Sequence, residues 1–388
     1  MNKDYVLVLP SWYPSRVHRF NGDFNERLVN ATSKYIKQIV LYVIKDATIK
    51  ETQIEVEEDD KIITYIIYYP AKGNSIISKF FLFCRYAYIS IKYTNIIIRK
   101  FGLPKLIHCY VIFPAGIMAK FVKWRYKIPI ILTEHWSAYY PEAKDSFMRS
   151  SILKRLLIRN LLKSVNHIIP VAHKLGYFIK QWAPGIPQTV IPNVVDTSSF
   201  NYSYENRGKT FKFLHISSMY YAKNVEGLLR VFENIAIERD NVELSLIGYM
   251  PDHIRHIING SRVLQSVIDY KGEIAYNQVS HYMKEHDCLV MFSRYESLPC
   301  VILEALCCGL PVIATDVGGI REVISQYNGI LIKSECETAL NEAIGAMIDN
   351  IDTYNREEIS KEAIKKFNYN NVTRSICEIY KKVIKLSC

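Results

Sequence analysis

Short apolar segments alternate with longer helical stretches along this chain, and the alternation runs in two separate series. A strand, a helix and a second strand form a βαβ unit, which builds parallel sheets whose buried strands are continuously apolar. The first series comprises segments 5–9, 37–44, 105–108, 129–133 and 167–170, and the second comprises 211–216, 242–247, 288–292 and 311–314. The pattern predicts an α/β protein with two doubly wound, Rossmann-like domains and a ligand cleft at the carboxyl ends of the strands.

The length of 388 residues suits two or three domains of roughly 150 residues each. A polar stretch at 197–210 separates the two series and has the composition of a linker. The end of the chain has a helical pattern. We therefore expect an N-terminal domain at 1–195, a C-terminal domain at 196–365, and a helical segment at 366–388 that crosses back toward the N-terminal domain.

The composition, 49% hydrophobic and 22% charged, is that of an ordinary globular protein. No apolar run reaches the roughly 18 residues of a membrane-spanning helix, and the one near the N-terminus is too short for a signal peptide. Nine cysteines are scattered without a CxxC pair, which argues against a disulfide framework or a zinc site. We expect a cytoplasmic protein. The acidic segment 55–60 predicts a solvated hairpin rather than a metal site.

The formal net charge of +11 suggests an anionic partner. The basic residues are dispersed and no nucleic-acid-binding signature occurs, so no nucleic-acid partner is expected. A phosphate-bearing substrate or an anionic membrane surface fits better, although a basic proteome would explain the charge equally well. Segment 75–100 interleaves aromatic and basic residues. It is either an interfacial helix or an ordinary helix with a solvated basic side.

Two glutamates, Glu296 and Glu304, follow the predicted strand at 288–292 in apolar surroundings. A buried carboxylate without a partner is destabilising. Ser297 is expected to cap the helix that carries Glu304, with Pro299 in its first turn. The helix N-terminus offers free N–H groups to an anion. The two carboxylates can accept hydrogen bonds from sugar and ribose hydroxyls on either side of a diphosphate.

A glycine pair, Gly318-Gly319, follows the predicted strand at 311–314. Glycine allows a ligand to approach the backbone closely, so the pair favours a ligand site at this turn. The alternative explanation is that Glu296 is an ordinary loop carboxylate and that Glu304 caps a backbone group.

Residues 287–324 resemble the signature of the retaining GT-B glycosyltransferases of family 4 (glycosyl transferases group 1), which carry a Glu-x7-Glu motif. Four other stretches resemble segments of the same family: LPSWYPSRVHRFNGDF (9–24), IHCYVIFPAGIMAK (107–120), ILTEHWSAYY (131–140) and VIPNVVD (190–196). The matches span nearly the whole chain. The resemblance implies the GT-B fold, with a nucleotide-sugar donor in the C-terminal domain and an acceptor in the N-terminal domain.

The resemblance also implies roles for single residues. Glu296 would contact hydroxyls of the donor sugar, and Glu304 those of the ribose. Lys223 would neutralise the diphosphate, His135 would lie near the reacting centre, and the backbone of Gly22 would approach the phosphate. Glu296, His135 and Lys223 are the expected catalytic residues. Backbone contacts to the donor are expected from Ser297, Leu298, Pro299, Cys300, Val301, Gly318 and Gly319.

These three single residues also have simpler explanations. Lys223 could be solvated, His135 could lie at the edge of the core, and Gly22 could make a turn. The chain also departs from the family, which has Gly-Arg where Ser217 and Ser218 stand here. The missing arginine would grip the diphosphate. Arg294 is a candidate replacement, and His108 is a possible supporting residue of the site.

The resemblance implies transfer of a hexosyl or N-acetylhexosaminyl group from a UDP- or GDP-sugar to a hydroxyl of a glycan or lipid-linked acceptor, in bacterial surface polysaccharide assembly. No cofactor is expected. No metal is expected either, because no DxD pair stands where magnesium would bridge phosphates. The two glutamates are not expected to act as a retaining glycosidase pair, whose carboxyls lie ~5 Å apart.

Two other functions stay open. One is a sugar-nucleotide epimerase on the same fold, which needs further acid–base groups in the cleft. The other is a catalytically silent GT-B partner subunit, suggested by the missing arginine. A dehydrogenase is disfavoured, because no GxGxxG follows the first strand.

Overall fold

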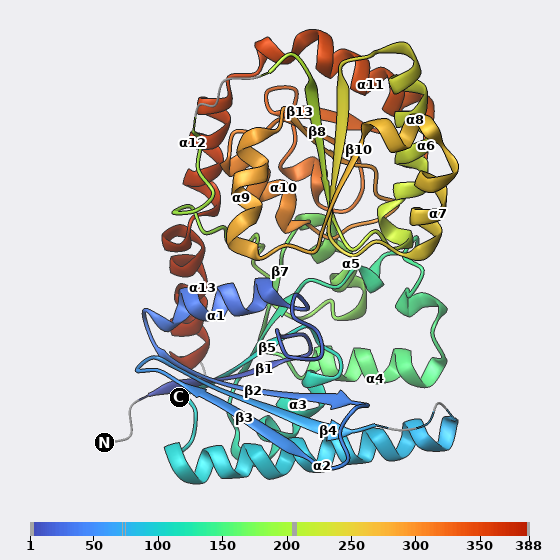
Figure 1. Cartoon of the computed structure of the whole chain (residues 1–388). Coiled ribbons are helices and arrows are strands. Elements are labelled where there is room, and N and C mark those ends of the chain that lie inside the picture. The colour runs from blue at the N-terminus through green and yellow to red at the C-terminus, as the bar shows by residue number, and fades with distance from the viewer. Residues whose placement is uncertain (1–3, 72, 74, 204–207, 386–388) are drawn as a thin grey trace.

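The computed structural model describes residues 4–71, 73, 75–203 and 208–385. It contains two α/β halves, each built on one mainly parallel sheet with helices on both faces (Figure 1). The N-terminal half carries the blue to green segments and the dark red last helix, and the C-terminal half carries the yellow-green to red segments before it. The prediction of two doubly wound, Rossmann-like domains is therefore confirmed. Residues 204–207 of the predicted linker lie outside the described residues.

The N-terminal sheet has seven strands in the order β3-β4-β2-β1-β5-β6-β7. Its strands are β1 (Tyr5–Pro10), β2 (Lys37–Asp46), β3 (Gln53–Glu58), β4 (Ile62–Pro70), β5 (Leu106–Tyr110), β6 (Ile130–Glu134) and β7 (His167–Pro170). The pair β3 and β4 is antiparallel, and all other neighbours are parallel. The acidic segment 55–60 forms the end of β3 and the turn of this hairpin, as predicted. Its charges keep an exposed edge strand from pairing with another chain.

The central strand β1 is buried on both faces, which explains its continuous apolar sequence. Leu7 and Leu9 pack in a cluster with residues of α2, α3 and α4, whereas Val6 and Val8 point to the opposite face and pack with α1. The helical elements of this half are α1 (Asp23–Ser33), α2 (Ile76–Phe101), α3 (Ala115–Tyr126), η1 (Ser137–Tyr139), η2 (Phe147–Arg149), α4 (Ile152–Lys163) and α5 (His173–Trp182).

The C-terminal sheet has six parallel strands in the order β10-β9-β8-β11-β12-β13. Its strands are β8 (Phe211–Ile216), β9 (Val242–Ile247), β10 (Ile268–Gly272), β11 (Cys288–Met291), β12 (Val312–Thr315) and β13 (Gly329–Ile332). The two edge strands, β10 and β13, were not predicted from the sequence. The sequence of β10, IDYKG, is largely polar, so it does not produce an apolar run, and β13 begins at a glycine and contributes only three apolar residues, ILI.

The helical elements of the C-terminal half are η3 (Tyr221–Lys223), α6 (Val225–Glu238), α7 (Asp252–Gly260), α8 (Arg262–Val267), α9 (Tyr276–Glu285), α10 (Cys300–Cys307), η4 (Ile320–Glu322), α11 (Glu337–Asn350), η5 (Ile351–Thr353) and α12 (Arg356–Phe367). The helix α10 begins at Cys300, and its N-cap is Pro299, in an extended conformation. The predicted cap at Ser297 is therefore wrong. A proline disfavours helical geometry in the residue before it. Pro299 therefore keeps Leu298 out of the helix.

The last helix, α13 (Tyr369–Lys385), returns to the N-terminal half, as predicted (Figure 1). The crossing is marked by a parallel bridge between Val195 and Asn368. Buried residues of α13 pack in one cluster with Val6, Val8 and α1. The chain thus begins and ends on the same half, which ties the two halves together twice.

The chain order reverses at one point in each sheet, between β1 and β5 and between β8 and β11. Ligands of open α/β sheets bind outside the carboxyl ends of the strands at such points. The loops that leave β1, β8 and β11 should therefore carry the functional residues.

Candidate functional site

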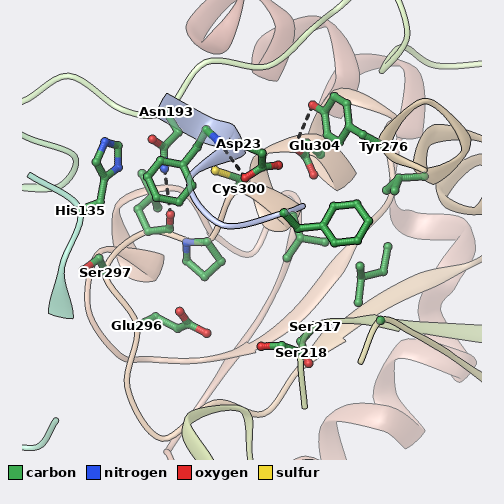
Figure 2. Close-up of a pocket in the computed structure, with 18 of the residues that line it drawn as sticks. Asp23, His135, Asn193, Ser217, Ser218, Tyr276, Glu296, Ser297, Cys300 and Glu304 are labelled. Atoms are coloured by element: carbon green, nitrogen blue, oxygen red, sulfur yellow. Dashed lines mark hydrogen bonds between the residues drawn. The ribbon is translucent and has the colours of Figure 1, made fainter. Parts of the chain in front are cut away.

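A cavity of about 510 Å³ lies between the two halves, at the carboxyl ends of both sheets. Its wall includes Trp12 and His135, which follow β1 and β6, and Lys223 and Glu296, which follow β8 and β11. The residues of the predicted site that line it are His135, Ser218, Lys223, Glu296, Ser297, Leu298, Pro299, Cys300, Val301 and Glu304. In Figure 2, Glu296 and Glu304 approach from different sides.

Glu296 is held at the cavity wall by a cation and a hydroxyl. Lys223 Nζ lies 2.5 Å from Glu296 Oε1, and Ser293 Oγ donates a hydrogen bond of 2.9 Å to the same oxygen. The carbonyl of Ser293 accepts a hydrogen bond of 2.7 Å from the Thr315 hydroxyl, which ties this loop to the end of β12. Lys223 is thus part of the site rather than an ordinary solvated lysine.

Glu304 forms a buried ion pair with Arg27, which the sequence analysis did not single out. Arg27 Nη1 lies 2.7 Å from Glu304 Oε1, and the side chains are 8% and 6% exposed. The Tyr276 hydroxyl donates a hydrogen bond of 3.0 Å to the same oxygen (Figure 2). Burial raises the pKa of Glu304, and the charge of Arg27 opposes that rise. Because Arg27 belongs to α1 and Glu304 to α10, the pair joins the two halves across the cavity.

His135 presents a neutral imidazole to the cavity. Burial lowers its pKa to about 3, and its Nε2 has no hydrogen-bond partner among the described residues. Its loop is fixed by Glu134, which accepts hydrogen bonds from the amides of His135 and Trp136. Glu134 also accepts bonds from the Ile112 amide and the Tyr139 hydroxyl. The imidazole is thus held in place with one nitrogen free for a ligand.

The start of α10 faces the cavity through residues 297–301. The first turn of a helix leaves its amide N–H groups without intrahelical acceptors, which favours an anion there. Asn193, from the predicted interdomain segment, supports this turn by donating a hydrogen bond of 3.2 Å from Nδ2 to the Leu298 carbonyl. Asn193 Oδ1 is buried without a partner among the described residues and faces the same cavity.

The glycine pair packs against the loop that carries Glu296. Neither Gly318 nor Gly319 is among the residues that line the cavity. Gly318 has φ +56°, and a Cβ there would lie 1.8 Å from the Glu296 carbonyl oxygen. The amide of Gly319 already donates a hydrogen bond of 2.6 Å to the Ser297 carbonyl. The pair therefore supports the loop that carries Glu296.

Gly22 is also in a left-handed conformation, with φ +77°, at the start of α1. A Cβ there would lie 2.4 Å from the backbone of Trp12, so glycine is needed for the loop to pack on itself. Gly22 does not itself line the cavity, whereas its neighbour Asp23 does.

Two of the three less certain candidates lie away from the cavity. Arg294 pairs with Glu226 at 2.9 Å and Glu335 at 3.0 Å and does not line the cavity. His108 is buried in β5 and uses both ring nitrogens, at 2.6 Å to the Tyr380 hydroxyl and 2.8 Å to the Thr133 hydroxyl. His108 therefore anchors α13 instead of serving the site. Ser218 does line the cavity.

A set of lining residues depends on tertiary packing and was not predicted from the sequence. They are Trp12, Asp23, Phe24, Arg27, Trp136, Asn193 and Tyr276. The sequence does contain a pattern that could have indicated Asp23 and Arg27. They are an acidic and a basic residue one helical turn apart, just after the loop glycine Gly22. No such pattern indicates Trp12 and Trp136. Their ring centroids lie 5.5 Å apart only because β1 and β6 belong to one sheet.

The fold and the cavity define a two-domain α/β protein with a cleft at the carboxyl ends of both sheets, and comparison with known families gives its family. "Glycosyl transferases group 1" matches residues 199–366, and "Glycosyltransferase Family 4" matches residues 56–199. The two matches together cover residues 56–366. The chain belongs to the GT-B glycosyltransferases of the group 1 and family 4 type, as the Glu-x7-Glu stretch predicted.

Curated relatives are distant. The "Putative teichuronic acid biosynthesis glycosyltransferase TuaC" of Bacillus subtilis (strain 168) is 27% identical, over 69% of this chain and 66% of its own length. The alpha-monoglucosyldiacylglycerol synthase of Streptococcus pneumoniae is 25% identical, over 76% of this chain and 70% of its own length. The gpi3 subunit of phosphatidylinositol N-acetylglucosaminyltransferase of Schizosaccharomyces pombe is 25% identical, and the match covers 60% of this chain and 52% of that one.

Solved structures show the same fold over the whole chain. Sucrose-phosphate synthase (tll1590) from Thermosynechococcus elongatus superposes with a TM-score of 0.80 at 16% identity and covers 99% of this chain and 100% of that chain. Anabaena Alr3699/HepE in complex with UDP and glucose has a TM-score of 0.72 at 16% identity and covers 98% and 99%.

Proposed function

We propose that this protein is a retaining, metal-independent glycosyltransferase that uses a UDP- or GDP-sugar. It would transfer a hexosyl or N-acetylhexosaminyl group to a hydroxyl of a glycan or lipid-linked acceptor, in bacterial surface polysaccharide assembly. One observation carries the proposal: Lys223, Glu296, Glu304 and the start of α10 converge on a single cavity at the switch points of both sheets. Support for the donor class comes from Alr3699/HepE, which was solved with UDP and glucose.

In the proposed reaction, the bond from the sugar C1 to the diphosphate oxygen breaks, and the acceptor oxygen bonds to C1 on the same face. The hydroxyl proton of the acceptor passes to the leaving phosphate oxygen. Negative charge develops on that phosphate, so its stabilisation is the main electrostatic task. Lys223 and the first-turn amides of α10, which line the same cavity, would do this. No covalent nucleophile is required.

The carboxylates would bind hydroxyl groups: Glu296 those of the donor sugar and Glu304 those of the ribose. Each is an acceptor with lone pairs beyond those used by its cation. The neutral His135 would contact the sugar near the reacting centre through its free Nε2. No cofactor beyond the donor substrate takes part in this scheme.

We also propose that the protein works in the cytoplasm, at the inner face of the membrane. Among the described residues, no helix is long and apolar enough to cross a bilayer. The helix α2 exposes Phe80 and Phe81, and α4 exposes Leu153 and Leu156. Exposed apolar side chains among lysines and arginines suit an anionic lipid surface.

A donor panel tests the proposed function. The purified protein is incubated with UDP- and GDP-hexoses and N-acetylhexosamines, with membrane extract as acceptor source, with and without EDTA. We expect release of free nucleotide that EDTA does not abolish, and losses of about 10²- to 10³-fold in Lys223→Ala and Glu296→Gln. The matched controls Lys271→Ala and Glu337→Gln, which change exposed ion pairs away from the cavity, should keep full activity.

The same panel separates the alternatives. Full activity in both site variants would contradict the site assignment. Conversion of the donor into another sugar nucleotide without acceptor would indicate an epimerase. If no sugar nucleotide raises the melting temperature, the chain is a silent partner subunit instead.

A further inference from the structure

The two cations that reach the cavity come from opposite halves of the chain. Among the described residues that line it, the lysine and arginine side chains are those of Lys223 and Arg27. The lining carboxylates are those of Asp23, Glu273, Glu296 and Glu304. A diphosphate adds further negative charge to this wall, so its binding needs every cation within reach. Position 218, which also lines the cavity, supplies a hydroxyl and no charge.

Arg27 keeps donor capacity while it is paired with Glu304. A guanidinium has five N–H donors. Its Nη1 bonds to Glu304, and its Nη2 lies 3.5 Å from Asp23 Oδ2. Its Nε has no acceptor among the described residues, although the residue is only 6% exposed. A buried donor without an acceptor is rare in proteins and suits a group that a ligand completes.

The surroundings of Arg27 hold the guanidinium at the cavity wall in the absence of a ligand. The Tyr276 ring lies 4.4 Å from the guanidinium carbon, and Glu304 fixes the other side. A guanidinium so placed is preorganised, so little side-chain entropy is lost when a phosphate binds.

We propose that Arg27 binds the donor diphosphate, as the second cation of a site whose first cation is Lys223. The inference rests on the proposed function, in which Glu304 holds the ribose next to that diphosphate. It assigns one phosphate contact to α1 and the other to η3. A nucleoside diphosphate then bridges the two halves, whereas a nucleoside contacts Glu304 alone.

The test measures how much the diphosphate adds to nucleoside binding. Dissociation constants of uridine, UDP, guanosine and GDP are determined by calorimetry, and the ratio of nucleoside to diphosphate values is the diphosphate gain. Arg27→Gln should lower the gain about 10- to 100-fold, the effect of one charge-assisted contact. Glu304→Gln should weaken the binding of nucleoside and of nucleoside diphosphate by the same factor, so the diphosphate gain should not fall.

The double variant Arg27→Gln/Glu304→Gln leaves no buried charge unpaired and should show the same lowered gain as Arg27→Gln. The control Arg239→Gln, which opens an exposed ion pair with Asp349, should keep the wild-type gain. A wild-type gain in both Arg27 variants would mean that Arg27 serves Glu304 alone, and the inference would be overturned. In that case, a diphosphate gain that Lys223→Ala lowers would still support the proposed function. A wild type that binds UDP and GDP no better than the nucleosides would overturn both.

Discussion

Substituting Gly318 by alanine tests why a glycine pair follows β12. Gly318 has φ +56°, and an added Cβ would lie 1.8 Å from the carbonyl oxygen and 2.7 Å from the carbonyl carbon of Glu296. Both contacts are with backbone atoms, so no side-chain rotation can relieve them. The loop that carries Glu296 must move, and Glu296 moves with it.

Two costs contribute to the expected effect. A non-glycine residue in the left-handed region costs about 1–2 kcal/mol. Forcing extra volume into a packed contact costs about 1–3 kcal/mol more. We therefore expect Gly318→Ala to lower the free energy of unfolding by about 2–5 kcal/mol.

Two other glycines separate these costs. Gly272 has φ +73° but no atom within 4 Å of an added Cβ, so Gly272→Ala should cost about 1–2 kcal/mol. Gly260, at the end of α7, has an open surrounding and no positive φ, so Gly260→Ala should be neutral or slightly stabilising. Urea unfolding midpoints measure all three variants. If Gly318→Ala were as stable as Gly272→Ala, the close approach to Glu296 would cost nothing and the reasoning would be refuted.

Two further outcomes concern the core and the surface. Burial lowers the pKa of His108 to about 3, so the folded protein keeps it neutral while the unfolded chain binds a proton below pH 6.5. The stability that depends on His108 is therefore lost as the pH falls from 6.5, and His108→Gln should reduce that loss by up to ~1.4 kcal/mol per pH unit; equal pH slopes of the unfolding free energy would contradict this. Leu153 and Leu156 are 79% and 57% exposed, and replacing both by serine should lower flotation with anionic vesicles at least about tenfold. The control Ile237→Ser, on the C-terminal half, should not lower it. Unchanged flotation of the Leu153 and Leu156 variant would remove α4 from the proposed membrane surface.

The sequence predicts those parts of the site that local pattern encodes. Strand ends locate the loops of Lys223 and Glu296, so their meeting in one cavity follows from the parallel order of β8 and β11. Arg27 is different, because its partner lies 277 positions away in the other half. That contact depends on how the two halves pack, which no local periodicity records.

For the glycine pair, the local sequence pattern is present but does not tell what the glycines make room for. A Gly-Gly turn after a strand has the same local signature whether a ligand or a protein backbone approaches it. The carbonyl of Glu296 and the Cβ of Ala172, 2.4 Å from an added Cβ at Gly319, occupy that space here. Only the fold decides between the two occupants.

The cation partners also bear on what the two glutamates can do. A general acid needs a carboxyl kept protonated, usually by an apolar site without a nearby cation. Glu296 and Glu304 each lie within 2.7 Å of a cation, so neither occupies the cation-free site that a general acid needs. A carboxylate paired with a cation in this way accepts hydrogen bonds and donates none. We therefore infer that both glutamates bind hydroxyl groups rather than transfer protons, so in the proposed reaction the proton of the acceptor passes to the substrate's own phosphate.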